Sequence, residues 1–134
     1  MKNIFLSIFA AVVLVSCGSI PGIGSKVGSS QPSIIDSKWV LADNVKGISP
    51  TMVLESGRVN GNSGCNNFFG ELVLDATAGN FKANNVASTK KACEDMSVET
   101  NFLQMLQEAN KYVVSGNTLE LYKNQLLLMK FNRQ

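Results

Sequence analysis

Short apolar stretches separated by turn residues make up most of the chain after residue 34, which is typical of a β-rich domain. Strands are predicted at residues 37–42, 52–55, 58–61, 68–75, 81–82, 112–115, 118–122 and 126–131. Ser56-Gly57 and Gly116-Asn117 are predicted hairpin turns, because glycine readily adopts the positive φ that such turns need. The last stretch is apolar on both faces and is therefore expected to be well covered.

Residues 97–111 have a different period. Four apolar residues recur there at spacings of three and four, and so share one face of a helix: Phe102, Leu103, Leu106 and Ala109. Ser97 is the expected N-cap, and Glu99 suits the first turn because of the helix dipole. This face and Trp39 are expected in the core. The sequence thus predicts an α+β fold: an antiparallel, β-rich, barrel-like single domain with one packed α-helix.

The first residues indicate a signal for export. Lys2 precedes an apolar run at residues 4–15, which as a helix would span about 18 Å at ~1.5 Å per residue. That is too short to cross a hydrocarbon core of about 30 Å, so the run is interpreted as part of a signal peptide over residues 1–16 and not as a core helix or membrane span. The sequence LVSC at residues 14–17 resembles the bacterial lipobox, which implies lipidation of Cys17 with diacylglycerol and an N-acyl chain such as palmitate.

The predicted cellular location follows from Cys17. Gly18 in place of aspartate favours the outer membrane, and we expect a lipid-anchored protein on its periplasmic face. Residues 17–33 are assigned to the lipidated cysteine and a flexible Gly/Ser tether, and residues 34–134 to the domain. Without Lys2, 11 basic residues stand against 10 acidic ones. Nucleic acid is not an expected partner because basic residues are not clustered, and we expect a monomer.

Cys65 and Cys93 are the only cysteines left once Cys17 is lipidated. An even number of cysteines in an oxidising compartment predicts a disulfide. A buried free pair and a reactive thiol are the alternatives. The chain contains no histidine to serve as the base of a reactive thiol, although a lysine or a helix terminus could lower a thiol pKa.

Glycine and asparagine are concentrated around Cys65, in the sequence GNSGCNNFFG at residues 61–70. A phosphate-binding loop does not fit, because the spacing differs and the Gly-Lys-Ser/Thr ending is absent. The motif is interpreted as structural: glycines permit sharp bends or close backbone approach, and asparagine side chains bond local backbone. Its predicted members are Gly61, Gly64, Asn66 and Gly70.

This motif resembles the META domain family when it is read with the segments that follow it. The resemblance rests on G-x-S-G-C-N followed by F-x-G, then T-x-x-A-C at 89–93, then E-x-x-F-x-x-x-L at 99–106 and a closing hairpin. It runs from about Trp39 to Phe131, with Leu72 and Lys91 departing from common family residues. The resemblance implies a compact β-rich, barrel-like domain with a helix, akin to HslJ-like heat-inducible proteins and bacterial lipoproteins. Members are linked to stress tolerance and drug resistance, and no catalytic set comes with the family.

Catalysis is not expected, and neither is a metal or a cofactor. Without histidine the commonest general base and metal ligand are missing, and the two cysteines lack CxxC spacing. Several carboxylates could be paired by folding, but nothing in the sequence singles out a pair: Glu55, Glu71, Asp75, Glu94 and Asp95. The last two precede the helix and are assigned to its dipole.

Three functions remain open. The leading hypothesis is a non-catalytic envelope lipoprotein that supports envelope stress or drug tolerance by binding an unidentified partner. The alternative is a periplasmic carrier of a small apolar ligand or lipid, suggested by the apolar residues 126–131 in a barrel. A protein-binding module is the third, with exposed aromatic residues near Phe68-Phe69 or Tyr122 marking its contact site.

Overall fold

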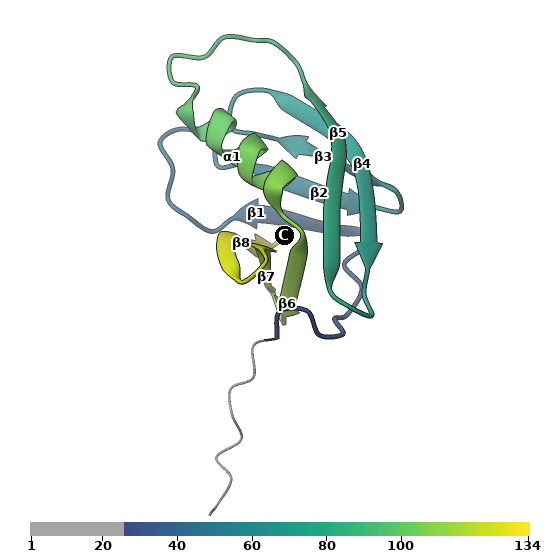
Figure 1. Cartoon of the computed structure of the whole chain (residues 1–134). Coiled ribbons are helices and arrows are strands. Elements are labelled where there is room, and N and C mark those ends of the chain that lie inside the picture. The colour runs from purple at the N-terminus through teal and green to yellow at the C-terminus, as the bar shows by residue number, and fades with distance from the viewer. Residues whose placement is uncertain (1–25) are drawn as a thin grey trace, which may run out of the picture.

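The structure is a computed structural model that describes residues 26–134, so Cys17 and the predicted signal peptide lie outside the described residues. Within them, antiparallel strands form a closed barrel in chain order, and the last strand pairs with the first (Figure 1). The predicted α+β, barrel-like domain with one helix is confirmed. Its elements are β1 (Ser37–Leu41), β2 (Thr51–Glu55), β3 (Arg58–Asn62), β4 (Asn67–Asp75), β5 (Asn80–Ser88), α1 (Ser97–Glu108), β6 (Lys111–Ser115), β7 (Thr118–Lys123) and β8 (Leu126–Arg133).

Both predicted hairpin turns are confirmed. Glu55 pairs with Arg58 across the first turn, and Ser115 pairs with Thr118 across the second. Gly57 has φ 73° and Gly116 has φ 57°, the left-handed region that glycine enters without steric cost.

Two predicted strands differ from those observed. β5 is not a short return at residues 81–82 but continues to Ser88. The expectation that residues 126–131 are well covered is wrong at one end: Leu126 is 64% exposed and Leu127 46% exposed. Both lie at the start of β8, directly after the turn that joins it to β7, and a register shift between Leu121 and Tyr122 precedes this hairpin end. Apolar composition therefore identified the strand but not which of its residues reach the core.

A bulge in β5 explains one glycine of the motif. Phe69 pairs with Ala87 and Glu71 with Asn84, so Gly70 alone faces two residues of β5. One of these, Asn85, has φ 50°. A Cβ on Gly70 would lie 2.9 Å from the carbonyl oxygen of Asn84, closer than such atoms come in proteins. The position therefore accepts only glycine without a shift of the strand.

Large side chains fill the inside of the barrel. Six buried aromatic residues line it, together with aliphatic ones: Trp39, Phe68, Phe81, Phe102, Tyr112 and Phe131. The ring of Phe102 lies 5.4 Å from that of Phe68 and 6.3 Å from that of Phe131, measured between centroids. Trp39 and the Phe102/Leu106 face are thus in the core, as predicted.

Helix α1 covers the weakest seam of the barrel. β5 and β6 are joined at a single residue pair, Asn80 with Lys111, whereas the other neighbouring strands pair over three residues or more. The helix lies beside β5 (Figure 1). Its side chains Phe102 and Leu106 are buried in the core. The seam therefore depends on the position of the helix.

The expected N-cap is wrong. Met96 is the residue before the first helical turn and makes no capping hydrogen bond with its side chain, while Ser97 is already helical. Asp95 Oδ1 instead accepts a hydrogen bond from the Ser97 N–H at 2.8 Å, which satisfies one amide of the first turn. The helix ends at Glu108, and the chain enters β6 at Lys111.

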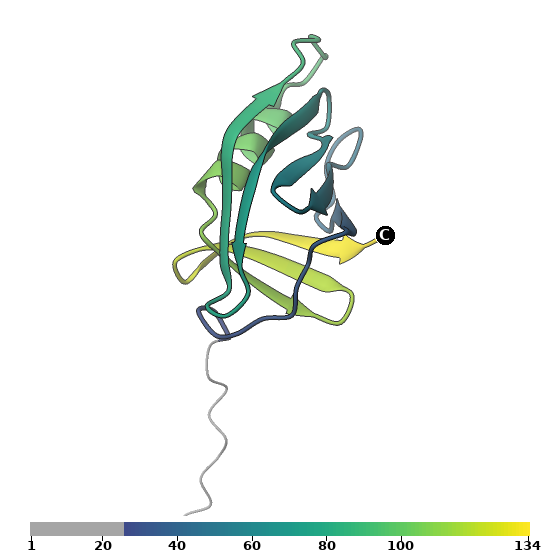
Figure 2. The ribbon, with the colours of Figure 1, turned by 90° about the vertical axis from the view of Figure 1, so that its right-hand side faces the viewer.

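The described end of the segment assigned to the tether lies against the barrel. Gln31 is 8% exposed, and its N–H donates to the carbonyl oxygen of Ala76 at 2.7 Å. In Figure 2 this segment follows one end of the barrel before it enters β1. Among residues 26–134 there is no helix long and apolar enough to span a membrane.

Replacing Gly61 with alanine should destabilise the domain strongly. A Cβ there would lie 2.0 Å from the carbonyl oxygen of Thr51 on the paired strand, so β2 and β3 would have to separate. We expect G61A to lower the free energy of unfolding by about 3 kcal/mol, at the upper end of overpacking costs. The control is G57A, where only the positive φ opposes alanine and the expected loss is about 1–2 kcal/mol. Urea unfolding measures both, and equal losses would contradict the steric argument.

Candidate functional site

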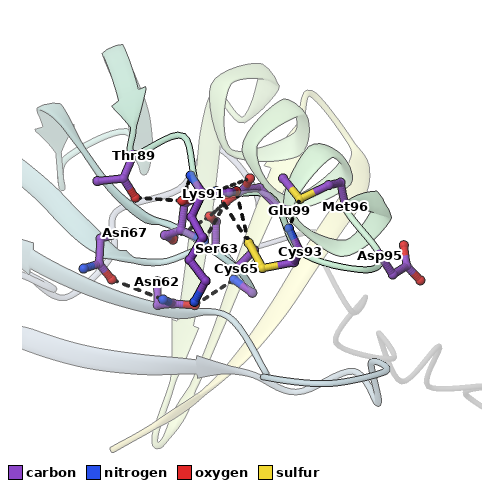
Figure 3. The surroundings of a disulfide bond; sticks show 12 residues. Asn62, Ser63, Cys65, Asn67, Thr89, Lys91, Cys93, Asp95, Met96 and Glu99 are labelled. Carbon is purple, nitrogen blue, oxygen red and sulfur yellow. Dashed lines mark hydrogen bonds between the residues drawn. A yellow bond between two sulfur atoms is a disulfide. The ribbon is translucent and has the colours of Figure 1, made fainter.

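Three segments far apart in sequence meet around the disulfide. They are the loop between β3 and β4, the loop between β5 and α1, and the first turn of α1 (Figure 3). We refer to the hydrogen-bonded residues there as the Asn66–Glu99 network, which consists of the side chains of Ser63, Asn66, Thr89 and Glu99 and the backbone of Lys91.

The predicted disulfide is confirmed. Cys65 and Cys93 are bonded, with their Cα atoms 6.1 Å apart and a sequence separation of 28. The bond joins the β3–β4 loop to the β5–α1 loop. The N–H of Cys93 also donates to Met96 Sδ at 3.3 Å, which links the second loop to the start of the helix.

Asn66 binds the second loop through both atoms of its amide. Its Oδ1 accepts from the Lys91 N–H at 2.8 Å and from the Thr89 hydroxyl at 2.8 Å, and its Nδ2 donates to the Lys91 carbonyl oxygen at 2.9 Å. The side chain therefore pairs with Lys91 as a neighbouring strand would. Local backbone was the expected partner of these asparagines. Asn62 fits, because its Oδ1 accepts from the Gly64 N–H, but Asn66 reaches a distant loop.

Glu99 is the buried charge of the network. Its side chain is 6% exposed, and its Oε1 accepts from the hydroxyl of Ser63 and from the Asn66 N–H at 2.9 Å. Its Oε2 accepts from Asn66 Nδ2 at 2.9 Å. Asn66 supplies two of the three donors and Ser63, in the same loop, supplies the third, so the carboxylate fixes the helix to the β3–β4 loop. The sequence predicts only a favourable interaction of Glu99 with the helix dipole. The structure adds these hydrogen bonds to the loop.

These hydrogen bonds keep Glu99 ionised despite its burial. Burial raises the pKa of Glu99, but the hydrogen bonds from Ser63 and Asn66 and the nearby charge of Lys90 outweigh it. The pKa of Glu99 therefore lies below its ordinary value. The carboxylate consequently stabilises the fold at neutral pH.

Two glycines of the motif permit close approach, Gly64 to the helix and Gly61 to β2. Gly64 has φ 112°, and a Cβ there would lie 2.9 Å from the Cγ1 of Val98 on the helix. Gly61 lies against the carbonyl oxygen of Thr51. The structural interpretation of Gly61, Gly64, Asn66 and Gly70 therefore has a specific contact behind each residue.

Shallow depressions flank the network. One of about 270 Å³ is lined by Asn66, Lys91 and Met96, and one of about 480 Å³ by Thr100, Leu103 and Gln107. Glu99 and Lys90 border both. Both carboxylate oxygens of Glu99 already accept hydrogen bonds from Ser63 or Asn66. This arrangement therefore holds the helix and the β3–β4 loop together. In the described part of the chain, no cluster of three or more His, Cys, Asp or Glu side chains is arranged to hold a metal ion.

The other carboxylates singled out from the sequence serve separate local roles. Glu55 and Glu71 lie on either side of Arg58, which pairs with both across β2, β3 and β4. Asp75 accepts from the N–H and hydroxyl of Thr77 in the β4–β5 turn, which lowers the pKa of this carboxyl. Asp95 accepts from Ser97, and Glu94 is exposed in the same loop.

The three aromatic residues considered as contact markers differ in exposure. Phe69 is 56% exposed on the outside of β4, whereas Phe68 is buried, which the alternation of a strand requires. Tyr122 is half-buried, and its hydroxyl donates to Glu120. Only Phe69 among them presents a large apolar surface.

Sequence reasoning missed the partners of Asn66 and Glu99. Ser63 is 36 residues from Glu99 in the sequence, and Thr89 and Lys91 are 23 and 25 residues from Asn66. No helical or strand periodicity relates residues at such separations. The available signal was an acidic residue on the helix among its apolar positions, since a carboxylate next to a core face needs donors.

Comparisons with known proteins agree with this fold and this motif. The META domain model matches residues 33–134, and the chain belongs to the META domain family. An NMR structure of a protein from Burkholderia xenovorans is similar, with a TM-score of 0.64 and 21% identity over 75% of this chain and 83% of that one. A second NMR structure has a TM-score of 0.57 and 20% identity over 72% and 88%. These similarities show the fold, and no curated protein matches the chain.

Removing the disulfide should cost a large share of the stability. For the double variant C65A/C93A we expect a loss of about 3–4 kcal/mol from the free energy of unfolding, according to the chain-entropy model. Urea unfolding of oxidised protein measures this loss. Wild-type protein in reducing agent is the control, and its mass should rise by about two units as two thiols form. Equal stability of the oxidised protein and the double variant would contradict the expectation.

Glu99 should make stability fall in acid. Its pKa is lower in the folded protein than in the unfolded chain, so its contribution is present above about pH 4.5 and is lost as pH falls through the folded pKa. In E99Q the new amide would face Asn66 Nδ2, donor against donor, with an expected loss of about 1–3 kcal/mol at pH 7. Urea unfolding between pH 7 and pH 3 should show the difference from wild type shrinking below pH 4.5.

The matched control is E94Q, because Glu94 is exposed in the loop before the helix. Its unfolding free energy should stay within about 0.5 kcal/mol of wild type. A difference between wild type and E99Q that stayed constant down to pH 3 would show that Glu99 is not the titrating group.

Proposed function

We propose that this chain is a lipid-anchored, non-catalytic envelope lipoprotein that supports tolerance of envelope stress or drugs by binding a partner protein. The main observation in support of this proposal is that the chain's own side chains fill the inside of the barrel. Six aromatic side chains occupy its interior, so the outer surface is what remains for recognition. The membership of the META domain family supports the link to stress tolerance.

The outer face of β2 to β5 supports binding of a protein. Phe69 pairs with Asn60 on one side and Ala87 on the other, and Val53 continues this uncharged row. Val73, four residues further along β4, is 57% exposed. Glu71 lies between Phe69 and Val73 on the same face of β4. Exposed aromatic side chains are enriched in protein contact surfaces, and charged residues are common at their rims.

The proposed location is the periplasmic face of the outer membrane. The lipobox-like sequence ending at Cys17 supports an anchor there, and the Cys65–Cys93 disulfide suits an oxidising compartment. The alternative of an apolar-ligand or lipid carrier is less well supported, because side chains of the chain itself occupy the inside of the barrel.

The proposal predicts that loss of the protein lowers survival under envelope stress or drugs, and that both the anchor and Phe69 are needed. Wild-type protein should restore survival to a deletion strain, while C17S and F69S should restore it less. F69S should fold normally, because an exposed substitution changes stability by about 0.5 kcal/mol or less. The control is L126S, which changes an apolar side chain of similar exposure on another hairpin.

Photocrosslinking identifies the partner. A photoreactive residue in place of Phe69 should capture a protein in intact cells, and the same residue in place of exposed Lys130 on β8 should not. A deletion strain with normal survival would contradict the stress role. Absence of any adduct at position 69 would contradict partner binding at this face.

A further inference from the structure

A buried glutamine fixes the segment before β1 to the barrel. The N–H of Gln31 donates to the Ala76 carbonyl oxygen, and its Oε1 accepts from the Val114 N–H at 3.1 Å. Its Nε2 donates to the Lys26 carbonyl oxygen at 3.1 Å. One residue thus connects β6 and the segment itself through its side chain, and the β4–β5 turn through its backbone.

Further contacts hold the same segment. The Tyr112 hydroxyl donates to the Pro32 carbonyl oxygen at 3.0 Å. Gly79, in the β4–β5 turn, has φ 60°, and a Cβ there would lie 2.9 Å from the carbonyl oxygen of Ser29 and 3.1 Å from Gln31 Cγ. The turn is therefore shaped to accept the segment. Any tether to a membrane effectively ends at Lys26.

This attachment lies at one end of the barrel. The β4–β5 turn and the first described residues are at that end, and the β5–α1 loop is at the other (Figures 1 and 2). β4 and β5 are nine residues long each, which separates the two ends by about 30 Å at ~3.3 Å per residue. The disulfide and the Asn66–Glu99 network belong to the far end.

We infer that the end of the barrel with residues 26–31 and the β4–β5 turn faces a phospholipid bilayer, and that the disulfide end faces away from it. The inference rests on the lipid anchor proposed at Cys17. Cys17 and Lys26 are nine residue steps apart, so the chain between their Cα atoms spans at most about 30 Å. A Gly/Ser-rich chain of that length has an r.m.s. reach of about 15–18 Å. Because that reach is shorter than the barrel, the near end stays at the bilayer surface.

Labels at the two ends test this orientation. Full-length lipidated protein is placed in phosphatidylethanolamine and phosphatidylglycerol vesicles that contain a nickel-chelating lipid. A nitroxide is attached at T77C in the β4–β5 turn or at T100C in the first turn of α1, since both threonines are exposed. Relaxation by nickel should be at least about twofold greater at T77C, given an end-to-end separation of about 30 Å.

The outcomes separate the orientation from the anchor. Equal relaxation at the two positions, or greater relaxation at T100C, in protein that floats with the vesicles would overturn the orientation while leaving the anchor intact. Protein that does not float, and whose mass lacks acyl chains, would overturn the anchor and the orientation with it. The C17S variant gives the value for protein without an anchor.

Two variants test whether the short tether is the cause. Insertion of thirty Gly/Ser residues before Lys26 raises the r.m.s. reach to about 31–37 Å, which exceeds the length of the barrel, without altering the described residues, and should shrink the difference between the labels. Q31A should shrink it as well, by releasing the segment, and its thermal midpoint reports whether the barrel remains folded. An unchanged difference in the insertion variant would overturn the tether as the cause.

Discussion

The contact between Glu99 and Asn66 holds the architecture together. The barrel is weakest between β5 and β6, where one residue pair joins the strands, and α1 covers that seam with Phe102 and Leu106. The first turn of α1 is fixed by Glu99, which receives hydrogen bonds from Asn66 and Ser63 on the opposite loop. A buried carboxylate without such donors would be very costly, so the charge requires the loop to keep its shape. Gly64, which approaches Val98 on the helix, and the Cys65–Cys93 disulfide hold the same loop in place.

Periodicity predicted most of the fold, because alternation and helical spacing report local geometry. Both hairpins, the Trp39 position and the Phe102/Leu106 face are confirmed. The failures have physical reasons. β5 is rich in polar residues and is interrupted by a bulge, so its sequence lacks the alternation that predicts a strand. Leu126 is apolar but exposed, so apolar composition does not reveal where a strand leaves the barrel. The donors of Glu99 come from distant segments, and no local pattern encodes such contacts.

The filled interior limits how this fold can act. Ring contacts between Phe68, Phe102 and Phe131 cross the barrel, with α1 contributing the central ring. Opening space for a ligand would displace the helix and break the hydrogen bonds of Glu99 as well as the core packing. Binding at the outer face of β4 leaves both intact. In the function proposed above, recognition takes place at this outer surface, where Phe69 and Val73 are exposed.

The two ends of the barrel differ in how they are held. At one end Gln31 and Tyr112 bind the incoming chain to β6 and the β4–β5 turn. At the other, the disulfide and the Asn66–Glu99 network join two loops to the helix. A force on the chain before Lys26 would thus pass through Gln31 into β6 and the β4–β5 turn. These two elements flank the single pair Asn80–Lys111, so Gln31 braces the β5–β6 seam at this end while α1 covers it.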